Sequence, residues 1–236
     1  MTIPRPSIVL FDMDGTTVRH INPRLLGVLE FADDLIFKMG KLFSRGDAAY
    51  DPDNEPKKSK SVLVHRALHK VRRKPVEQIV QPCPGIYAIL NLIRAQGIPL
   101  GIVSNGLGKG YGDDILEKFH LSQYFKVAIF REDFSKSKPH PDPLLRALKD
   151  LKDPLTPDDI VWYIGDRHKD ILAALAADKI VPATVVPLAY GLNASVAVLE
   201  KSLGEDDIGP ENIIMNYHDF ARTARDVLGD KGAIAA

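Results

Sequence analysis

The chain has 236 residues, of which 45% are hydrophobic and 26% are charged, so it is long and apolar enough for one large globular domain or a medium core with a small insert. Its 31 basic side chains balance 31 acidic ones, and the charge therefore gives no reason to expect nucleic acid or an anionic membrane as a partner. The single cysteine, Cys83, excludes an internal disulfide framework and suits a reducing compartment.

The first residues of the chain do not have the pattern of a signal peptide, because their apolar stretch is short and aspartates follow it at once. No apolar run approaches the roughly 18–20 residues of a membrane span. We therefore expect a cytoplasmic protein that binds neither membrane nor nucleic acid and exists as a monomer or a homodimer.

Short β-rich runs alternate with helical patterns along most of the chain. Near-continuous apolar runs are typical of strands that are covered on both faces of a parallel sheet. The runs that fit this description are 7–14, 98–105, 127–130, 160–166, 183–190 and 212–216. The segments with helical spacing between them are 85–97, 113–121, 141–151 and 169–178. This alternation predicts an α/β fold with a doubly wound parallel sheet.

The first of these runs ends in two aspartates, Asp12 and Asp14, which are one residue apart. Side chains alternate with period two along a strand, so both carboxylates would face the same side. Two like charges side by side reduce stability unless a cation lies between them or a reaction needs both.

The segment 19–81 interrupts the alternation. It contains helical patterns at 23–43 and 61–73 around a polar, proline-containing stretch, and we find no convincing strand in it. We therefore predict a core domain formed by 1–18 and 82–236, with 19–81 as a helical cap domain. Ligands bind at the carboxyl ends of strands in open α/β sheets, so this insert is expected to lie over the site.

Polar residues follow four of the predicted strands. The carboxyl ends of parallel strands meet at one edge of the sheet, so we expect these residues to lie together. They are Asp12 and Asp14, then Ser104 and Asn105, then Lys138, and finally Asp166 and Asp170.

Such a set suits chemistry on a phosphoryl group. Asp12, Asp166, and the side chain or backbone carbonyl of Asp14 are hard oxygen ligands of the kind that Mg²⁺ prefers. A carboxylate attacks phosphorus only when both negative charges are screened, which Mg²⁺ and Lys138 would do. Ser104 and the backbone N–H groups near it suit the equatorial phosphoryl oxygens.

Four motifs in the order DMDGT, SNG, SKPHPDP and GDRHKD resemble those of the haloacid dehalogenase superfamily of phosphohydrolases, in particular the phosphoglycolate phosphatase type. The resemblance covers about 1–18 and 82–236, and the insert resembles the helical cap that many members carry after the first motif. It implies that Asp12 is the nucleophile that forms an aspartyl phosphate and that Asp14 is the general acid and base.

The same resemblance assigns the remaining polar residues. Ser104, Asn105 and Lys138 would bind the phosphoryl group, and Asp166 would complete the Mg²⁺ site with Asp12 and Asp14. Asp170 would support the metal site or Lys138.

The chain departs from these relatives directly after the first motif. Where they usually continue with Leu-Val-Asp-Ser, this chain has Thr17-Val18-Arg19-His20. This difference does not touch the proposed catalytic set, but it weakens any transfer of substrate identity.

We therefore expect a Mg²⁺-dependent phosphatase that acts on a small-molecule phosphate monoester. Two alternatives stay open: a phosphomutase of the same fold, and a regulator that binds a phosphate ligand without turnover. A dehalogenase is disfavoured, because cleavage of a carbon–halogen bond does not call for Asp14 or a full metal site.

Overall fold

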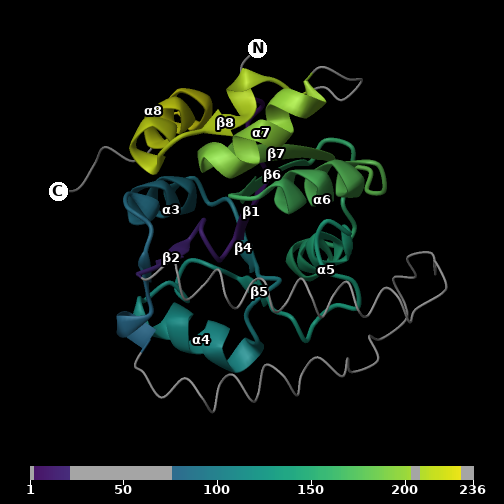
Figure 1. Ribbon diagram of the computed structural model, residues 1–236. Helices are drawn as coiled ribbons and strands as arrows, with labels where there is room; N and C mark the ends of the chain where they lie inside the picture. The colour runs from purple at the N-terminus through teal and green to yellow at the C-terminus, as the bar shows by residue number, and fades with distance from the viewer. Residues whose placement is uncertain (1–2, 22–75, 203–207, 230–236) are drawn as a thin grey trace.

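The computed structural model describes residues 3–21, 76–202 and 208–229 (Figure 1). Most of the predicted cap, 22–75, lies outside the described residues. Its helical content, its position over the site and the division into two domains therefore stay predictions.

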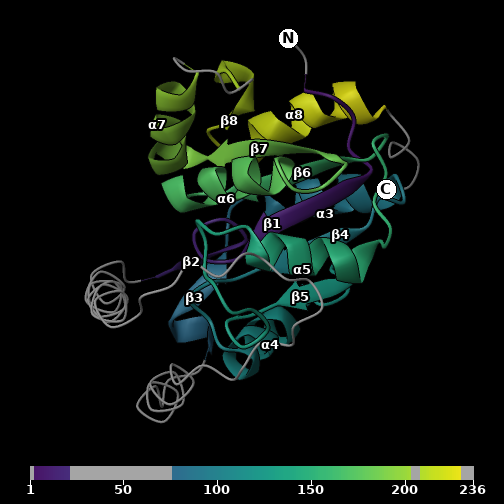
Figure 2. The ribbon, with the colours of Figure 1, turned by 90° about the vertical axis from the view of Figure 1, so that its right-hand side faces the viewer.

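A six-stranded parallel sheet forms the centre of the fold, in the order β5-β4-β1-β6-β7-β8. Figure 2 shows its larger strands side by side in this order, with β1 in the middle. The strands are β1 (Ile8–Asp12), β4 (Leu100–Val103), β5 (Val127–Ile129), β6 (Ile160–Gly165), β7 (Thr184–Tyr190) and β8 (Ile213–Ile214). All six predicted strands are present, and the predicted fold class is confirmed.

Helices cover both faces of the sheet (Figure 1). Helices α3, α4 and α8 pack with Val9 and Phe11 on one face, whereas α5 and α6 pack with Ile8 and Leu10 on the other. Helix α7 packs against α6 in a smaller cluster. The helices are α3 (Ile86–Ala95), α4 (Lys109–Lys118), α5 (Asp142–Leu151), α6 (His168–Asp178), α7 (Gly191–Lys201) and α8 (Tyr217–Leu228). Single 3-10 turns occur at Val76–Gln78 and Pro210–Asn212.

Helix α4 begins four residues earlier than predicted, at Lys109 instead of residue 113. Its first turn contains two glycines, which disfavour a helix in sequence terms. The structure gives the reason for one of them: a Cβ atom on Gly112 would lie 2.0 Å from the ring of Phe130. Close packing therefore overrides the local propensity.

Two short strands, β2 (Val18–His20) and β3 (Val80–Pro82), pair in a separate antiparallel sheet. The expectation that 19–81 contains no strand is therefore wrong. Three residues per strand are too few to produce a recognisable alternation. The pairing of Val18 with Pro82 brings the two ends of the insert together. Figure 2 shows β2 and β3 beside the carboxyl end of β1.

The sheet positions one edge for chemistry. All five residues of β1 are buried, and its last residue, Asp12, pairs with Val103 of β4. Phe11 pairs in the same way with Ile164 of β6. The loops that follow β1, β4 and β6 therefore leave the sheet at the same level. Within the described ranges, no helix combines the length and apolar character that crossing a lipid bilayer requires.

Candidate active site

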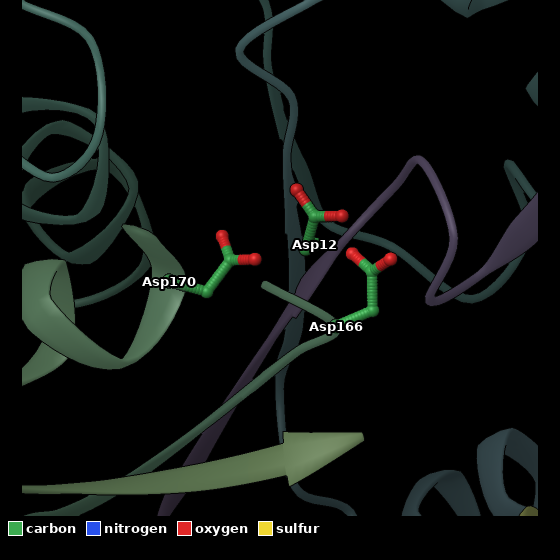
Figure 3. Close-up of side chains that lie close together, drawn as sticks. All are labelled: Asp12, Asp166 and Asp170. Carbon is green, nitrogen blue, oxygen red and sulfur yellow. The ribbon is translucent and has the colours of Figure 1, made fainter. Parts of the chain in front are cut away.

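Three carboxylates converge at the carboxyl edge of the sheet (Figure 3). Asp12 is the last residue of β1, Asp166 directly follows β6, and Asp170 lies in the first turn of α6. One oxygen atom from each lies within 4.8 Å of the others. Asp12 and Asp170 are buried and Asp166 is partly buried. Three negative charges in this small space are the arrangement that a bound cation would stabilise.

Two glycines make this convergence possible. A Cβ atom on Gly15, whose φ is +90°, would lie 2.0 Å from Oδ2 of Asp166. A Cβ atom on Gly165 would lie 2.3 Å from Cβ of Asp170. The Asp170 carboxylate is further oriented by the backbone N–H of Arg167, which donates to Oδ2 at 3.0 Å. The loop and helix start thus hold the carboxylates at close range.

Lys138 is a buried cation within this cluster. Its Nζ forms an ion pair with Oδ1 of Asp12 and a second one, at 2.7 Å, with Oδ1 of Asp170. It also donates a hydrogen bond to the hydroxyl of Tyr163 at 2.8 Å. The loop before α5 therefore places one positive charge between the end of β1 and the start of α6.

Tyr163 is a site residue that the sequence did not indicate. Its hydroxyl, which accepts from Lys138, donates to Oδ1 of Asp170 at 2.8 Å. In the sequence it stands inside an apolar run and has the pattern of an ordinary core residue. Only its hydroxyl could have indicated a role in the site, because a tyrosine in a buried strand needs a hydrogen-bond partner for this group.

Asp14 lies apart from the three-carboxylate cluster. Its Oδ2 accepts a hydrogen bond from Oγ of Ser104 at 3.3 Å, and Nε2 of His20 lies 3.5 Å from its Oδ1. Ser104 is itself fixed, since its Oγ accepts from the backbone N–H of Leu107 at 3.1 Å. The predicted neighbours Asp14 and Ser104 are thus brought together. Whether Asp14 would contact a metal by its side chain or by its backbone carbonyl stays a prediction.

The side chain of Asn105 contacts the loop that carries Lys138. Its Oδ1 accepts from the backbone N–H of Lys138, and its Nδ2 donates to the carbonyl of the same residue, both at 3.1 Å. The amide therefore ties the loop after β4 to the loop that carries Lys138. The predicted contact of Asn105 with a phosphoryl group would use the second N–H of this amide or the backbone, and it stays a prediction.

Burial and the neighbouring charges shift the pKa values of the groups in the cluster. Burial, opposed by Lys138 and reinforced by the other carboxylates, raises the pKa of Asp12 well above its usual value. Burial and the nearby Asp170 raise the pKa of Asp166 to about 7. Burial alone would lower the pKa of Lys138, but Asp12 and Asp170 outweigh it and raise this pKa.

These residues fit a hard divalent cation. The donor set consists of carboxylate oxygens, which Mg²⁺ prefers. In the described part of the chain, Oδ1 of Asp166 is buried and has no hydrogen-bond partner. A cation beside Asp12 and Asp166 would favour their ionised forms and so relieve the effect of burial on both.

Comparisons with known proteins identify the family of this chain. A family profile described as "Haloacid dehalogenase-like hydrolase" matches residues 44–182, a range that does not include Asp12 and Asp14. Curated relatives named phosphoglycolate phosphatase are 29% identical over 146 residues in Shigella boydii and 34% identical over 115 residues in Escherichia coli K12. These alignments cover 62% and 49% of this chain and 55% and 42% of the relatives. The chain thus spans about half the length of the curated relatives it matches.

A solved structure is similar over almost the entire chain. It is a haloacid dehalogenase superfamily hydrolase from Ehrlichia chaffeensis, with a TM-score of 0.59 and 21% identity. The alignment covers 97% of this chain and 100% of that one, and at this identity it supports the fold alone. With the matched profile extending over more than half of its residues, this chain belongs to the haloacid dehalogenase-like hydrolase family.

Proposed function

We propose that the protein is a Mg²⁺-dependent phosphatase that hydrolyses a small phosphate monoester through an aspartyl phosphate on Asp12. The observation that carries this proposal is the position of Asp12. Its carboxylate lies in the oxygen cluster with Asp166 and Asp170, while its Oδ1 pairs with the buried ammonium of Lys138. A nucleophilic carboxylate needs this combination of positive charge and fixed orientation before it can approach a phosphate dianion.

In the first step, Asp12 attacks the phosphorus atom and the bond to the leaving oxygen breaks. Lys138 engages Oδ1, so we assign the attack to Oδ2. Asp14 gives a proton to the leaving oxygen as an alcohol departs. The hydroxyl of Ser104, which donates to Asp14, would turn to a phosphoryl oxygen of the bound ester and hold it with the backbone N–H groups of its loop.

In the second step, water attacks the phosphorus atom of the aspartyl phosphate. Asp14, now ionised, accepts a proton from this water, the acyl phosphate bond breaks, and inorganic phosphate leaves. Asp12 returns to its carboxylate form. One residue thus acts first as an acid and then as a base.

Asp12 and Asp166, with the backbone carbonyl of Asp14, would hold Mg²⁺, and Asp170 would support the site. The ion, when bound, supplies the positive charge that lets a carboxylate and a phosphoryl group come together.

The substrate would be a small soluble ester. The curated relatives are named phosphoglycolate phosphatases, so 2-phosphoglycolate is the first ester to assay. The core residues would contact only the phosphoryl group, which all esters share. The predicted cap, 19–81, would supply the discrimination and would leave little room for a folded protein or a duplex.

The test is release of inorganic phosphate from p-nitrophenyl phosphate and from 2-phosphoglycolate. We expect release with Mg²⁺, none in EDTA, and recovery when Mg²⁺ is restored in excess. Asp12→Asn should reduce kcat by at least about a thousand-fold. Isomerisation of a sugar phosphate without net release would identify a mutase. Binding of phosphate without turnover of either ester would identify a regulator, and full activity in EDTA would contradict the metal assignment.

A further inference from the structure

We propose that Tyr163 is a positioning residue that acts through Lys138. Its hydroxyl fixes the direction of the ammonium group and, through it, the orientation of the Asp12 carboxylate. This inference rests on the proposed function for its catalytic consequence, but the contact itself can be tested without turnover.

The ammonium of Lys138 has three N–H donors, and the structure provides three acceptors. They are Oδ1 of Asp12, Oδ1 of Asp170 and the hydroxyl of Tyr163, with the latter two at 2.7 and 2.8 Å. A lysine ammonium is attached to a flexible four-carbon stem and is therefore normally mobile. The hydroxyl of Tyr163 and Oδ1 of Asp170 lie 2.8 Å from each other, so they form a triangle with the ammonium. Together with Asp12 they restrict the position of the charge.

Tyr163 also connects the two partners of the ammonium. Its hydroxyl accepts from Lys138 and donates to Asp170 at 2.8 Å, so both functions of the oxygen are used. The hydroxyl thereby holds Asp170 and Lys138 at fixed separation. The fixed ammonium in turn orients the carboxylate of Asp12, with which it forms an ion pair.

A neutral acceptor suits this position better than a further carboxylate would. Asp12, Asp166 and Asp170 with the ammonium of Lys138 carry two net negative charges, which one divalent cation balances. Another acidic side chain would exceed that balance. A tyrosine supplies the third acceptor without adding charge.

The alternative is that Tyr163 only fills the core. Its ring is buried with Leu10 and Ala173 on the α5 and α6 face of the sheet, and a phenylalanine would fill the same volume. A buried hydroxyl reduces stability unless it is hydrogen-bonded, so a purely apolar role would not favour tyrosine here. Tyr163→Phe separates the two explanations, because it keeps the ring and removes only the oxygen.

With Tyr163→Phe, the buried ammonium loses one of its three acceptors and Lys138 can shift from Asp12. We expect kcat to fall about ten- to a hundred-fold, because hydrogen bonds to charged groups are among the stronger ones in proteins. KM should change less than kcat, since Ser104 and its loop still bind the phosphoryl group. A change in KM with an unaltered kcat would contradict the proposal.

The decisive experiment is a double-mutant cycle with Lys138→Met, read by kcat and by thermal unfolding. If Tyr163 acts through Lys138, Tyr163→Phe should lower kcat and stability in the wild type and lower them clearly less beside Lys138→Met, where only its bond to Asp170 is lost. Tyr217→Phe is the matched control. It also removes a fully buried hydroxyl, which donates to the carbonyl of Thr16 at 3.0 Å, and its effects should be independent of Lys138→Met.

Additive effects of Tyr163→Phe and Lys138→Met on the unfolding free energy would overturn the inference whether or not a substrate is known. Wild-type kcat in Tyr163→Phe would overturn it as well. If the wild type hydrolyses neither ester, the proposed function fails, while the unfolding cycle still decides whether Tyr163 and Lys138 are coupled.

Discussion

The side-chain amide of Asn105 holds the backbone of Lys138 by two hydrogen bonds, one accepted and one donated, both 3.1 Å long. The loop after β4 and the loop before α5 are thereby joined at the residue that delivers the buried positive charge. Lys138 is thus fixed at both ends, by Asn105 at its backbone and by three acceptors at its ammonium.

Asn105→Asp should be more harmful than Asn105→Ala. The carboxylate cannot donate to the carbonyl of Lys138 and would repel it, whereas alanine only removes both bonds. We expect Asn105→Ala to lower the unfolding free energy by about 1–3 kcal/mol and kcat by about ten-fold. Chemical denaturation and phosphate release measure the two effects. Asn91→Ala, which removes an exposed amide, is the control and should change both only slightly.

Gly15→Ala should disturb the metal site specifically. Its φ of +90° disfavours a side chain, and the new Cβ would lie 2.0 Å from Oδ2 of Asp166. We expect a loss of about 1–3 kcal/mol in stability from the backbone and a rise of about ten-fold or more in the Mg²⁺ concentration for half-maximal activity. A Mg²⁺ titration of phosphate release measures the second effect.

Gly97→Ala is the matched control for this change. Gly97 has a similar φ of +72°, but nothing lies within 4 Å of the position of its Cβ. It should show the backbone cost without any change in Mg²⁺ requirement. Equal Mg²⁺ requirements in the two variants would contradict the close contact of Gly15 with Asp166.

The sequence predicts the fold well where apolar runs are long. Six strands could be located because each central strand is covered on both faces and therefore has few polar residues. Helix α8 was missed although its buried residues, Tyr217, Phe220, Ala221 and Ala224, follow helical spacing. Helix α7, β2 and β3 were also not predicted. Helix α7 begins with a glycine, which disfavours a helix, and the two strands are too short to give a periodic signal.

The site is predictable in part for a related reason. Strand ends meet at one edge, so the convergence of Asp12, Asp166 and Lys138 follows from topology. The direction of a side chain within a loop does not, and the turn of Asn105 toward the backbone of Lys138 has no local sequence signal. Tyr163 was hidden because its ring satisfies the apolar pattern while its hydroxyl serves the polar cluster.

His20→Ala should affect esters according to their leaving group. Nε2 of His20 lies 3.5 Å from Oδ1 of Asp14, which has no hydrogen-bond partner in the described part of the chain. If His20 helps to place Asp14, its loss should slow phosphoryl transfer to Asp12 only when the leaving oxygen needs a proton. We expect the rate of this first step, measured before the aspartyl phosphate is hydrolysed, to fall about ten-fold for an alkyl phosphate and less than about two-fold for p-nitrophenyl phosphate. Equal losses for both esters would assign His20 a general structural role.

Asp159 should make stability depend on pH at a distance from the site. The hydrogen bond from Lys152, opposed by burial and reinforced by Thr156 and Ser7, lowers the pKa of its carboxyl. A lowered pKa in the folded state adds stability above the unfolded value of about 4, and this contribution is lost as the pH falls below it.

Asp159→Asn should therefore lower the unfolding free energy by about 1–3 kcal/mol at pH 7, with the difference from wild type shrinking below about pH 4. Denaturation curves at several pH values measure it. A difference that is constant from pH 7 to pH 3 would show that the ionised carboxylate is not what stabilises the fold.

The central claim, covalent transfer to Asp12, is tested most directly in Asp14→Asn. This variant should still attack p-nitrophenyl phosphate, whose leaving group needs no proton, but should hydrolyse the aspartyl phosphate slowly. After acid quenching during turnover, mass spectrometry of the peptide that contains Asp12 should find it phosphorylated, with a burst of about one p-nitrophenol per enzyme. An unmodified peptide from a variant that releases p-nitrophenol without a burst would contradict the account.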